Sequence, residues 1–304
     1  MNTASEVIEA HQKAGRFFDA ANVKSFVREA GTGAPIVLMH GVPASSFLYR
    51  KVLAEIADRG ARGIAFDLPG LGLADRPDDY DYTWTGLGRF ARAAVDKLEV
   101  DRFHLVVHDI GGPVGFELAA AIPDRIRSLT ILNTIVDVAS FRRPWTMQPF
   151  AVSGLGALWL KTMIPPLFRR LMFIQGIADR SAITNAELDA WVALLKRGDG
   201  GRAFLKIMQG FELTEAKQSI YREVVKGNGY PVQIVWGDRD PALPLDARRG
   251  RPGFGRLAQT AAGLEKVHTV PAKHFLQEDQ APALADHIVR LAMASAKSDD
   301  AQPS

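Results

Sequence analysis

The sequence lacks several features that would place the protein in a special class. None of its 304 residues is cysteine, which excludes disulfide bonds, thiolate metal ligands and a cysteine nucleophile. It contains no run of about 18 apolar residues, the length that a membrane-spanning helix needs. The first ten residues are polar and acidic and do not resemble a signal peptide. We therefore expect a soluble, cytoplasmic protein that has no contact with membranes.

Neither sign of charge dominates the chain. There are 37 Lys and Arg against 34 Asp and Glu, a formal net charge of +3. The densest basic stretch, residues 248–256, is interleaved with glycine and has a single aromatic residue, too few to stack successive bases. We expect this stretch to be a solvated loop and the protein to have no nucleic-acid partner. Paired metal-ligand spacings such as HExxH are missing as well, so we expect no metal and no cofactor.

Short β-branched runs alternate with longer helical patterns, which is typical of parallel βαβ units. Strands are expected at 23–29, 36–40, 63–67, 103–108, 129–133, 233–236 and 266–270, with helices at 47–59, 87–98, 113–121 and 282–294. The rhythm stops between residues 137 and 228, where the patterns are helical. We expect an α/β fold with a mostly parallel central sheet and helices on both faces. Residues 1–136 and 229–304 would form the core, with a tail that frays from about 296, and 137–228 an inserted helical cap over the carboxyl edge of the sheet.

The strongest chemical signal is residues 105–112, LVVHDIGG, where a hydrophobic strand ends in an acid and two glycines lead into a helix. A strand, a sharp turn and a helix are the context of a nucleophile elbow. The residue at its apex is Asp109, whereas a serine hydrolase has serine there. A carboxylate that only caps the following helix is the simpler interpretation. The glycines, which allow close approach of strand and helix, favour the elbow.

Two further loops follow predicted strands. In such sheets the loop after the third strand and the residue after the nucleophile each supply one backbone N–H to an oxyanion hole. The loop here begins His40-Gly41-Val42-Pro43, which nominates the amides of Val42 and Ile110. His40 itself is a candidate substrate-binding residue.

An acid and a histidine complete the order that this architecture requires, namely nucleophile, acid, histidine. Asp240 follows the strand at 233–236, and the turn after Gly237 should direct it toward the sheet edge; Asp238 is the alternate. Of seven histidines, only His274 follows the last strand, lies in a loop and comes after both acids. We therefore predict a catalytic set of Asp109, Asp240 and His274.

With these residues in view, the chain resembles the α/β-hydrolase superfamily, in the branch with an Asp nucleophile that holds epoxide hydrolases and haloalkane dehalogenases. Residues 40–50, HGVPASSFLYR, resemble the dehalogenase oxyanion loop, and DLPGLG at 67–72 resembles the family's loop after the fourth strand. The resemblance implies an alkyl ester on Asp109 that a water activated by His274 hydrolyses. It also implies a small apolar epoxide or haloalkane as substrate, water as co-substrate and a possible homodimer.

The leaving group separates the alternatives. Haloalkane dehalogenases usually hold the halide with side-chain N–H donors, but here the two positions beside the nucleophile are Ile110 and Val42; a cap tryptophan, Trp145 or Trp159, could supply one donor. Epoxide hydrolases usually protonate the alkoxide with cap tyrosines, and only Tyr221 lies clearly within the cap. We expect epoxide hydrolysis to a vicinal diol. The alternatives are haloalkane dehalogenation, hydrolysis of an activated ester or lactone, and a relative that binds small molecules without turnover.

Overall fold

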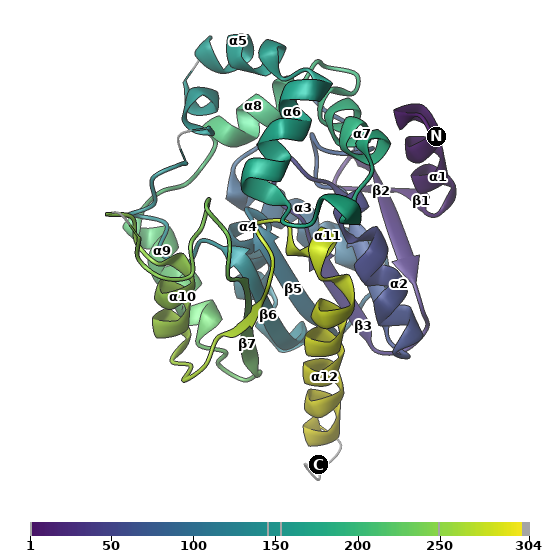
Figure 1. Ribbon diagram of the computed structural model, residues 1–304. Coiled ribbons are helices and arrows are strands. Elements are labelled where there is room, and N and C mark those ends of the chain that lie inside the picture. The colour runs from purple at the N-terminus through teal and green to yellow at the C-terminus, as the bar shows by residue number, and fades with distance from the viewer. Residues whose placement is uncertain (1, 145, 153, 249, 300–304) are drawn as a thin grey trace.

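The computed structural model describes residues 2–144, 146–152, 154–248 and 250–299, and its centre is an eight-stranded sheet (Figure 1). The strand order is β1-β2-β4-β3-β5-β6-β7-β8. β2 runs antiparallel to β1 and β4, and all other neighbours are parallel, so the predicted mostly parallel sheet is confirmed. The strands are β1 (Arg16–Ala20), β2 (Val23–Ala30), β3 (Pro35–Met39), β4 (Arg62–Phe66), β5 (Phe103–Asp109), β6 (Ile126–Thr134), β7 (Val232–Gly237) and β8 (His268–Val270).

Helices cover both faces of this sheet, which is why its central strands are continuous apolar runs. α2 (Arg50–Asp58) and α12 (Ala281–Asp299) pack together over one face, and α3 (Trp84–Lys97) and α4 (Gly111–Ala121) over the other. α10 (Phe254–Ala262) joins the second layer. The side chains of each face form a separate apolar cluster, so β5 is held from both sides and its carboxyl end is a rigid platform.

The part of the chain between β6 and β7 contains helices and, within the described residues, no strand. Figure 1 shows most of them above the carboxyl ends of the strands. They are α5 (Leu155–Thr162), α6 (Pro165–Leu171), the π-helical turn Met172–Gly176, α7 (Asn185–Lys196) and α8 (Arg202–Gln209), with single 3-10 turns at Gln148–Ala151 and Arg180–Ala182. The last helix of the segment, α9 (Glu215–Val225), instead packs against α4 and α10 on the face of the sheet.

Buried ion pairs fasten the helices above the strands, which we call the cap, to the rest of the chain. Arg50, at the start of α2, is only 10 % exposed and pairs with Glu187 of α7 at 2.7 Å and with Glu278 at 2.5 Å. Glu278 lies on α11 (Leu276–Asp279), directly after the loop that carries His274. One guanidinium thus joins α2, α7 and α11. Its two carboxylate partners offset the cost of burying the cation.

Several element boundaries differ from the expectations. An N-terminal helix, α1 (Ala4–Lys13), and strand β1 were not predicted, and α12 extends to Asp299 beyond the predicted fraying point near 296. The basic stretch 248–256 is a loop only in its first part, because α10 begins at Phe254, whose ring is buried. Among the described residues, no helix combines the length and apolar character needed to cross a bilayer.

Candidate active site

Asp109 stands at the carboxyl end of β5, where the backbone turns sharply into α4. Its φ is +53°, in the left-handed region that a residue with a side chain rarely adopts. The turn depends on close approach of neighbouring backbone: a Cβ atom at Gly41 would overlap the Asp109 carboxyl, and one at Gly112 would overlap the hydroxyl of Thr134. Thr134 also donates that hydroxyl to the carbonyl oxygen of Asp109. The strained elbow is therefore held by its surroundings.

Two backbone amides bind the Asp109 carboxylate. The Val42 N–H donates to Oδ1 at 2.7 Å, and the Ile110 amide also hydrogen-bonds to this carboxyl. Ile110 immediately precedes α4, so the positive end of the helix dipole adds to the two donors. Both amides predicted from the sequence therefore donate to the carboxylate of Asp109.

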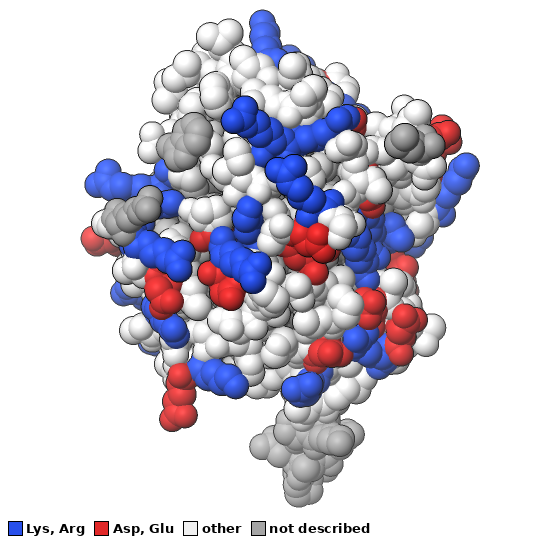
Figure 2. Space-filling model, viewed as in Figure 1, with Lys and Arg blue, Asp and Glu red and all other residues white. Residues whose placement is uncertain are grey.

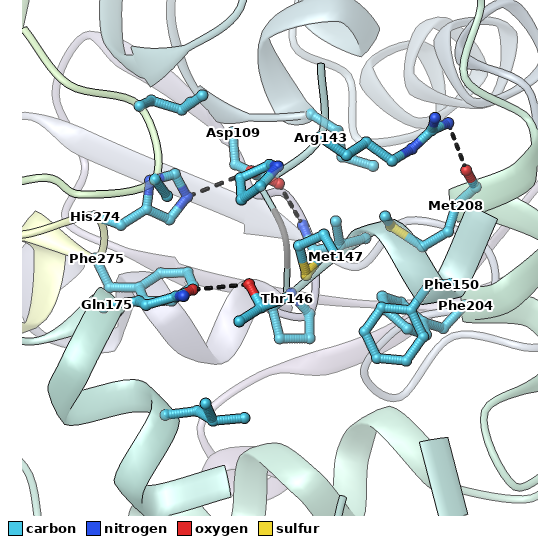
Figure 3. Close-up of a pocket in the computed structure, with 18 of the residues that line it drawn as sticks. Asp109, Arg143, Thr146, Met147, Phe150, Gln175, Phe204, Met208, His274 and Phe275 are labelled. Atoms are coloured by element: carbon cyan, nitrogen blue, oxygen red, sulfur yellow. Dashed lines mark hydrogen bonds and ion pairs between the residues drawn. The ribbon is translucent and has the colours of Figure 1, made fainter. Parts of the chain in front are cut away.

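His274 lies between two carboxylates. Its Nε2 is 3.3 Å from Oδ2 of Asp109, and its Nδ1 is 2.8 Å from Oδ2 of Asp240. Asp240 and His274 are both buried. Asp238, the alternate acid, is exposed and lies beside Arg239. The structure thus brings the three predicted catalytic side chains together in one hydrogen-bonded row (Figure 3 shows its Asp109–His274 part).

The position of Asp240 depends on a residue that sequence reasoning missed. Asn133, on β6, donates its side-chain N–H to Asp240 Oδ2 at 2.7 Å and accepts the backbone N–H of Gly237 at 2.8 Å. The other carboxylate oxygen accepts the N–H groups of Ala242 and Leu243. A polar side chain near the carboxyl end of a predicted buried strand was the available signal for Asn133.

The backbone beside His274 is fixed from two directions. The His108 ring donates from Nε2 to the His274 carbonyl at 2.8 Å. From the cap, the carbonyl of Gly176 accepts the Phe275 N–H at 2.8 Å, and the carbonyl of Phe173 accepts Nζ of Lys273. Both cap residues belong to the π-helical turn, a feature frequently found at functional sites. Core and cap therefore both set the position of the imidazole.

The charges in this row shift one another's protonation. Burial alone would raise the pKa of Asp109, but the hydrogen bond and charge of His274 outweigh it and hold that pKa below its ordinary value. Burial alone would lower the pKa of His274, but the charge of Asp240 and the contacts with Asp109 outweigh it and raise the pKa to about 10. At neutral pH the resting site therefore holds an ionised Asp109 beside an imidazolium.

A cavity of about 130 Å³ lies between this row and the cap. Its described lining is almost wholly apolar, with phenylalanine and methionine from the cap facing Val42, Pro43 and Ile110 of the core. Apart from Asp109 and His274, the polar lining side chains are Arg143, Thr146 and Gln175 (Figure 3). Thr146 donates its hydroxyl to Oε1 of Gln175 at 3.0 Å, which leaves the amide N–H groups of Gln175 available.

His40 does not contact this cavity, so its predicted substrate-binding role is wrong. Its ring is fully buried beneath the oxyanion loop. The N–H of Leu68 donates to its Nε2 at 3.1 Å, and its Nδ1 lies 2.9 Å from the Gly41 carbonyl. Both ring nitrogens are used to join two loops. His40 is therefore a neutral structural residue.

Two of the cap candidates are also corrected, and one lies outside the described residues. Tyr221 belongs to α9, which packs on the core, and its hydroxyl donates to Glu117 at 2.8 Å rather than lining the cavity. Trp159, on α5, is absent from the described lining. Trp145 is the candidate that the described residues do not include. Arg143, Thr146 and Gln175 were missed because the sequence does not indicate which cap side chains face inward.

The arrangement suits covalent chemistry by a carboxylate nucleophile. An ionised carboxylate lines an apolar cavity, two amides can stabilise an oxyanion at its carbon, and the oriented imidazole can act as a base toward a water. Within the described ranges, no group of three or more His, Asp or Glu side chains could hold a metal ion.

Comparisons with known proteins agree with this fold. The family model for the alpha/beta hydrolase fold matches residues 34–281. "Haloalkane dehalogenase 2" of Mycobacterium tuberculosis is 27% identical over 280 residues, covering 90% of this chain and 93% of the relative. The structure is similar to Cfl2 from Burkholderia cenocepacia, with a TM-score of 0.76, 23% identity, and 91% and 94% of the two chains covered. It is also similar to the epoxide hydrolase VrEH1 of Vigna radiata, with a TM-score of 0.72, 21% identity, and 92% and 97% covered.

The family model covers more than half of the chain, and the strand order and elbow described above carry the same fold. The chain belongs to the α/β-hydrolase family and is an α/β-fold hydrolase.

Proposed function

We propose that this enzyme opens a small epoxide to a vicinal diol through an alkyl ester on Asp109. One observation carries the proposal: Asp109 lines the cavity with its Oδ2 3.3 Å from His274 Nε2, while the Val42 amide donates to its Oδ1. A carboxylate nucleophile attacks an sp³ carbon, and the apolar lining of the cavity can pack against the carbon skeleton around it.

The atoms balance in two steps. First, Asp109 Oδ2 bonds to an epoxide carbon, the carbon–oxygen bond of the ring breaks, and its electron pair remains on the alkoxide. Esterification removes the Asp109 charge that helps to raise the pKa of His274, so the imidazolium releases its proton, which the alkoxide takes up through water. Next, neutral His274 deprotonates a water that attacks the carbonyl carbon of the Asp109 ester, and the Val42 and Ile110 amides stabilise the oxyanion. Collapse releases the diol and restores the ionised carboxylate and the imidazolium.

We propose that Gln175 holds the leaving oxygen. Its amide is oriented by Thr146, and it is the uncharged N–H donor of the described cavity lining. Replacing Gln175 by Leu should slow ester formation about 10- to 100-fold, the range for losing a hydrogen bond to a charged group. Pre-steady-state appearance of the ester measures this step directly.

Ester hydrolysis should change little in the Gln175→Leu variant, because that step uses His274 and the two amides. The exposed Gln12 gives a matched control, since Gln12→Leu makes the same change outside the described cavity lining. A rate of ester formation within twofold of the unchanged enzyme would remove Gln175 from the proposed mechanism.

A haloalkane is the second candidate substrate, because the curated relative that spans 90% of this chain is named a haloalkane dehalogenase. The same two steps would then release a halide. Against this candidate, Val42 and Ile110 line the cavity at the positions flanking the nucleophile and carry no side-chain donor.

The test is a single turnover in ¹⁸O-labelled water with enzyme in excess over substrate. With styrene oxide, the first diol should contain no label and Asp109 should gain one ¹⁸O, found by mass spectrometry of its peptide. Labelled diol without labelled Asp109 would overturn the ester route. A parallel reaction with 1-bromobutane that releases bromide, with no diol from styrene oxide, would instead favour the haloalkane. Turnover of neither would favour a relative that only binds small molecules.

The remaining expectations stay proposals: a core of residues 1–136 and 229–304, a cap of 137–228, a cytoplasmic location and a homodimer. The packing of α9 on α4 and α10 places the last helix of the cap segment in the core layer. Sedimentation velocity of the purified chain tests the homodimer.

A further inference from the structure

One charged side chain of the cavity has no part in the proposed reaction. Arg143 lies just after β6, where the chain enters the cap, and it is the only Lys or Arg among the described lining residues. Figure 3 shows its guanidinium extended toward Met208 of α8. The surrounding lining consists mainly of phenylalanine, methionine and leucine side chains.

The contacts of Arg143 fix its orientation without neutralising its charge. The guanidinium lies 4.5 Å from the centroid of the Phe211 ring, and Nη2 donates to the Met208 carbonyl at 2.9 Å. Nε is buried and has no hydrogen-bond partner among the described residues. A guanidinium has five N–H donors, so one carbonyl leaves most of them unused.

In the described part of the chain, no carboxylate forms an ion pair with Arg143, in contrast to the cap-fastening Arg50 with its two glutamates. Burial lowers the pKa of the Arg143 guanidinium, and no facing acid raises it. A cation partly removed from water without a counter-ion is costly. A bound anion would supply the missing partner.

The charge of the cap points the same way. Residues 137–214, which precede α9, contain ten Lys and Arg and six Asp and Glu, a net charge of +4, although the whole chain has a net charge of only +3. In Figure 2, basic side chains spread over the upper, cap part of the visible face, whereas most acidic side chains lie lower. Such a field attracts anions toward the cap.

We propose that the substrate carries a carboxylate, which pairs with Arg143 while the electrophilic carbon faces Asp109. This inference rests on the proposed function and adds a substrate class to it, a short acid with an epoxide or halogen at the other end. The cavity of about 130 Å³ limits the length. An engineered cavity of about 150 Å³ holds benzene, so a chain of about four to six carbons is the matching size.

The first experiment measures binding and requires no turnover. Calorimetric titration with butanoate, pentanoate and hexanoate, each compared with its primary amide, separates the charge from the shape. At least one acid should bind about 10- to 100-fold more tightly than its amide, the range for a charge-assisted hydrogen bond. Arg143→Gln should abolish this preference, and Arg143→Lys should keep part of it.

The neighbouring Arg142 is exposed and supplies the matched control, because Arg142→Gln removes the same charge outside the cavity lining and should keep the preference. Arg143→Gln also loses the bond to Met208, so its thermal unfolding and its amide binding are measured to show that the fold is intact. Equal binding of acids and amides, no saturable binding of any acid, or an unchanged preference in Arg143→Gln would each overturn the inference.

Turnover separates this inference from the proposed function. The enzyme should hydrolyse 4,5-epoxypentanoate with a kcat/KM about 10- to 100-fold above that of 4,5-epoxypentanamide. Hydrolysis of both compounds at equal rates would reject the carboxylate subsite and keep the epoxide reaction. Selective binding of the acids without hydrolysis of any epoxide would keep the subsite and reject the epoxide reaction.

Discussion

Replacing His274 by Gln is expected to stop the reaction after its first step, so that the enzyme accumulates as an alkyl ester on Asp109. In this variant the Val42 and Ile110 amides still stabilise the ionised form of Asp109, which needs no base to attack. The alkoxide can take its proton from water, but the water of the second step has lost its base. We expect turnover to fall by about 10²- to 10⁴-fold. Intact-protein mass spectrometry should show an added mass equal to that of one substrate molecule, located on the Asp109 peptide.

His268→Gln is the matched control for this experiment. His268 is a partly buried histidine whose ring lies against His287, and it is not among the described lining residues of the cavity. This variant should turn over normally and carry no adduct. A His274→Gln protein that folds, and that shows no adduct with a substrate the unchanged enzyme consumes, would contradict the two-step route.

The second large effect is expected for Asp109→Asn, which removes the nucleophile while keeping a side chain that can accept the Val42 N–H. No ester should form, and turnover should fall by at least about 10⁴-fold, the scale seen when a nucleophile is lost. The pKa of His274 should also fall from about 10, because the contacts with Asp109 contribute to raising it. An NMR titration of the imidazole measures this shift.

The direction in which the pKa of His274 shifts tests its coupling to Asp109. With Asp109 ionised, the imidazolium persists to a pH near 10; in the variant, the proton should leave at lower pH. The exposed Asp238 supplies the control, since Asp238→Asn should alter neither turnover nor the titration. An unchanged titration midpoint in Asp109→Asn would mean that the two side chains are not coupled as the 3.3 Å contact implies.

The sheet was largely predictable because its central strands are buried on both faces. β5 and β6 are almost entirely buried, so the sequence itself carries continuous apolar runs that end at polar residues. The strand β1 was missed for the opposite reason. Its side chains alternate between exposed and buried, and it pairs with β2 across a two-residue turn, a weaker pattern than a continuous run.

The row of Asp109, His274 and Asp240 was predictable because each member follows a strand, and parallel strands bring their carboxyl ends to one edge. Asn133 shows the limit of this reasoning. It lies in the same position on β6, but its role depends on which acid its amide reaches, and the sequence alone does not indicate that distance. His40 shows the converse, a strand-end histidine whose two ring nitrogens are used by neighbouring loops.

The order of residues along the chain, taken by itself, determined the α/β architecture, the carboxylate at the elbow and the acid and histidine that follow it. A chain in which buried strands alternate with helices has few possible topologies, and the carboxyl ends of its parallel strands meet at one edge of the sheet. Only the tertiary structure decided what the cap contributes: Tyr221 faces a glutamate on α4, whereas Gln175 and Arg143 line the cavity. The physical reason is that a helix presents its side chains all around its axis, and packing against distant helices selects which of them meet the substrate.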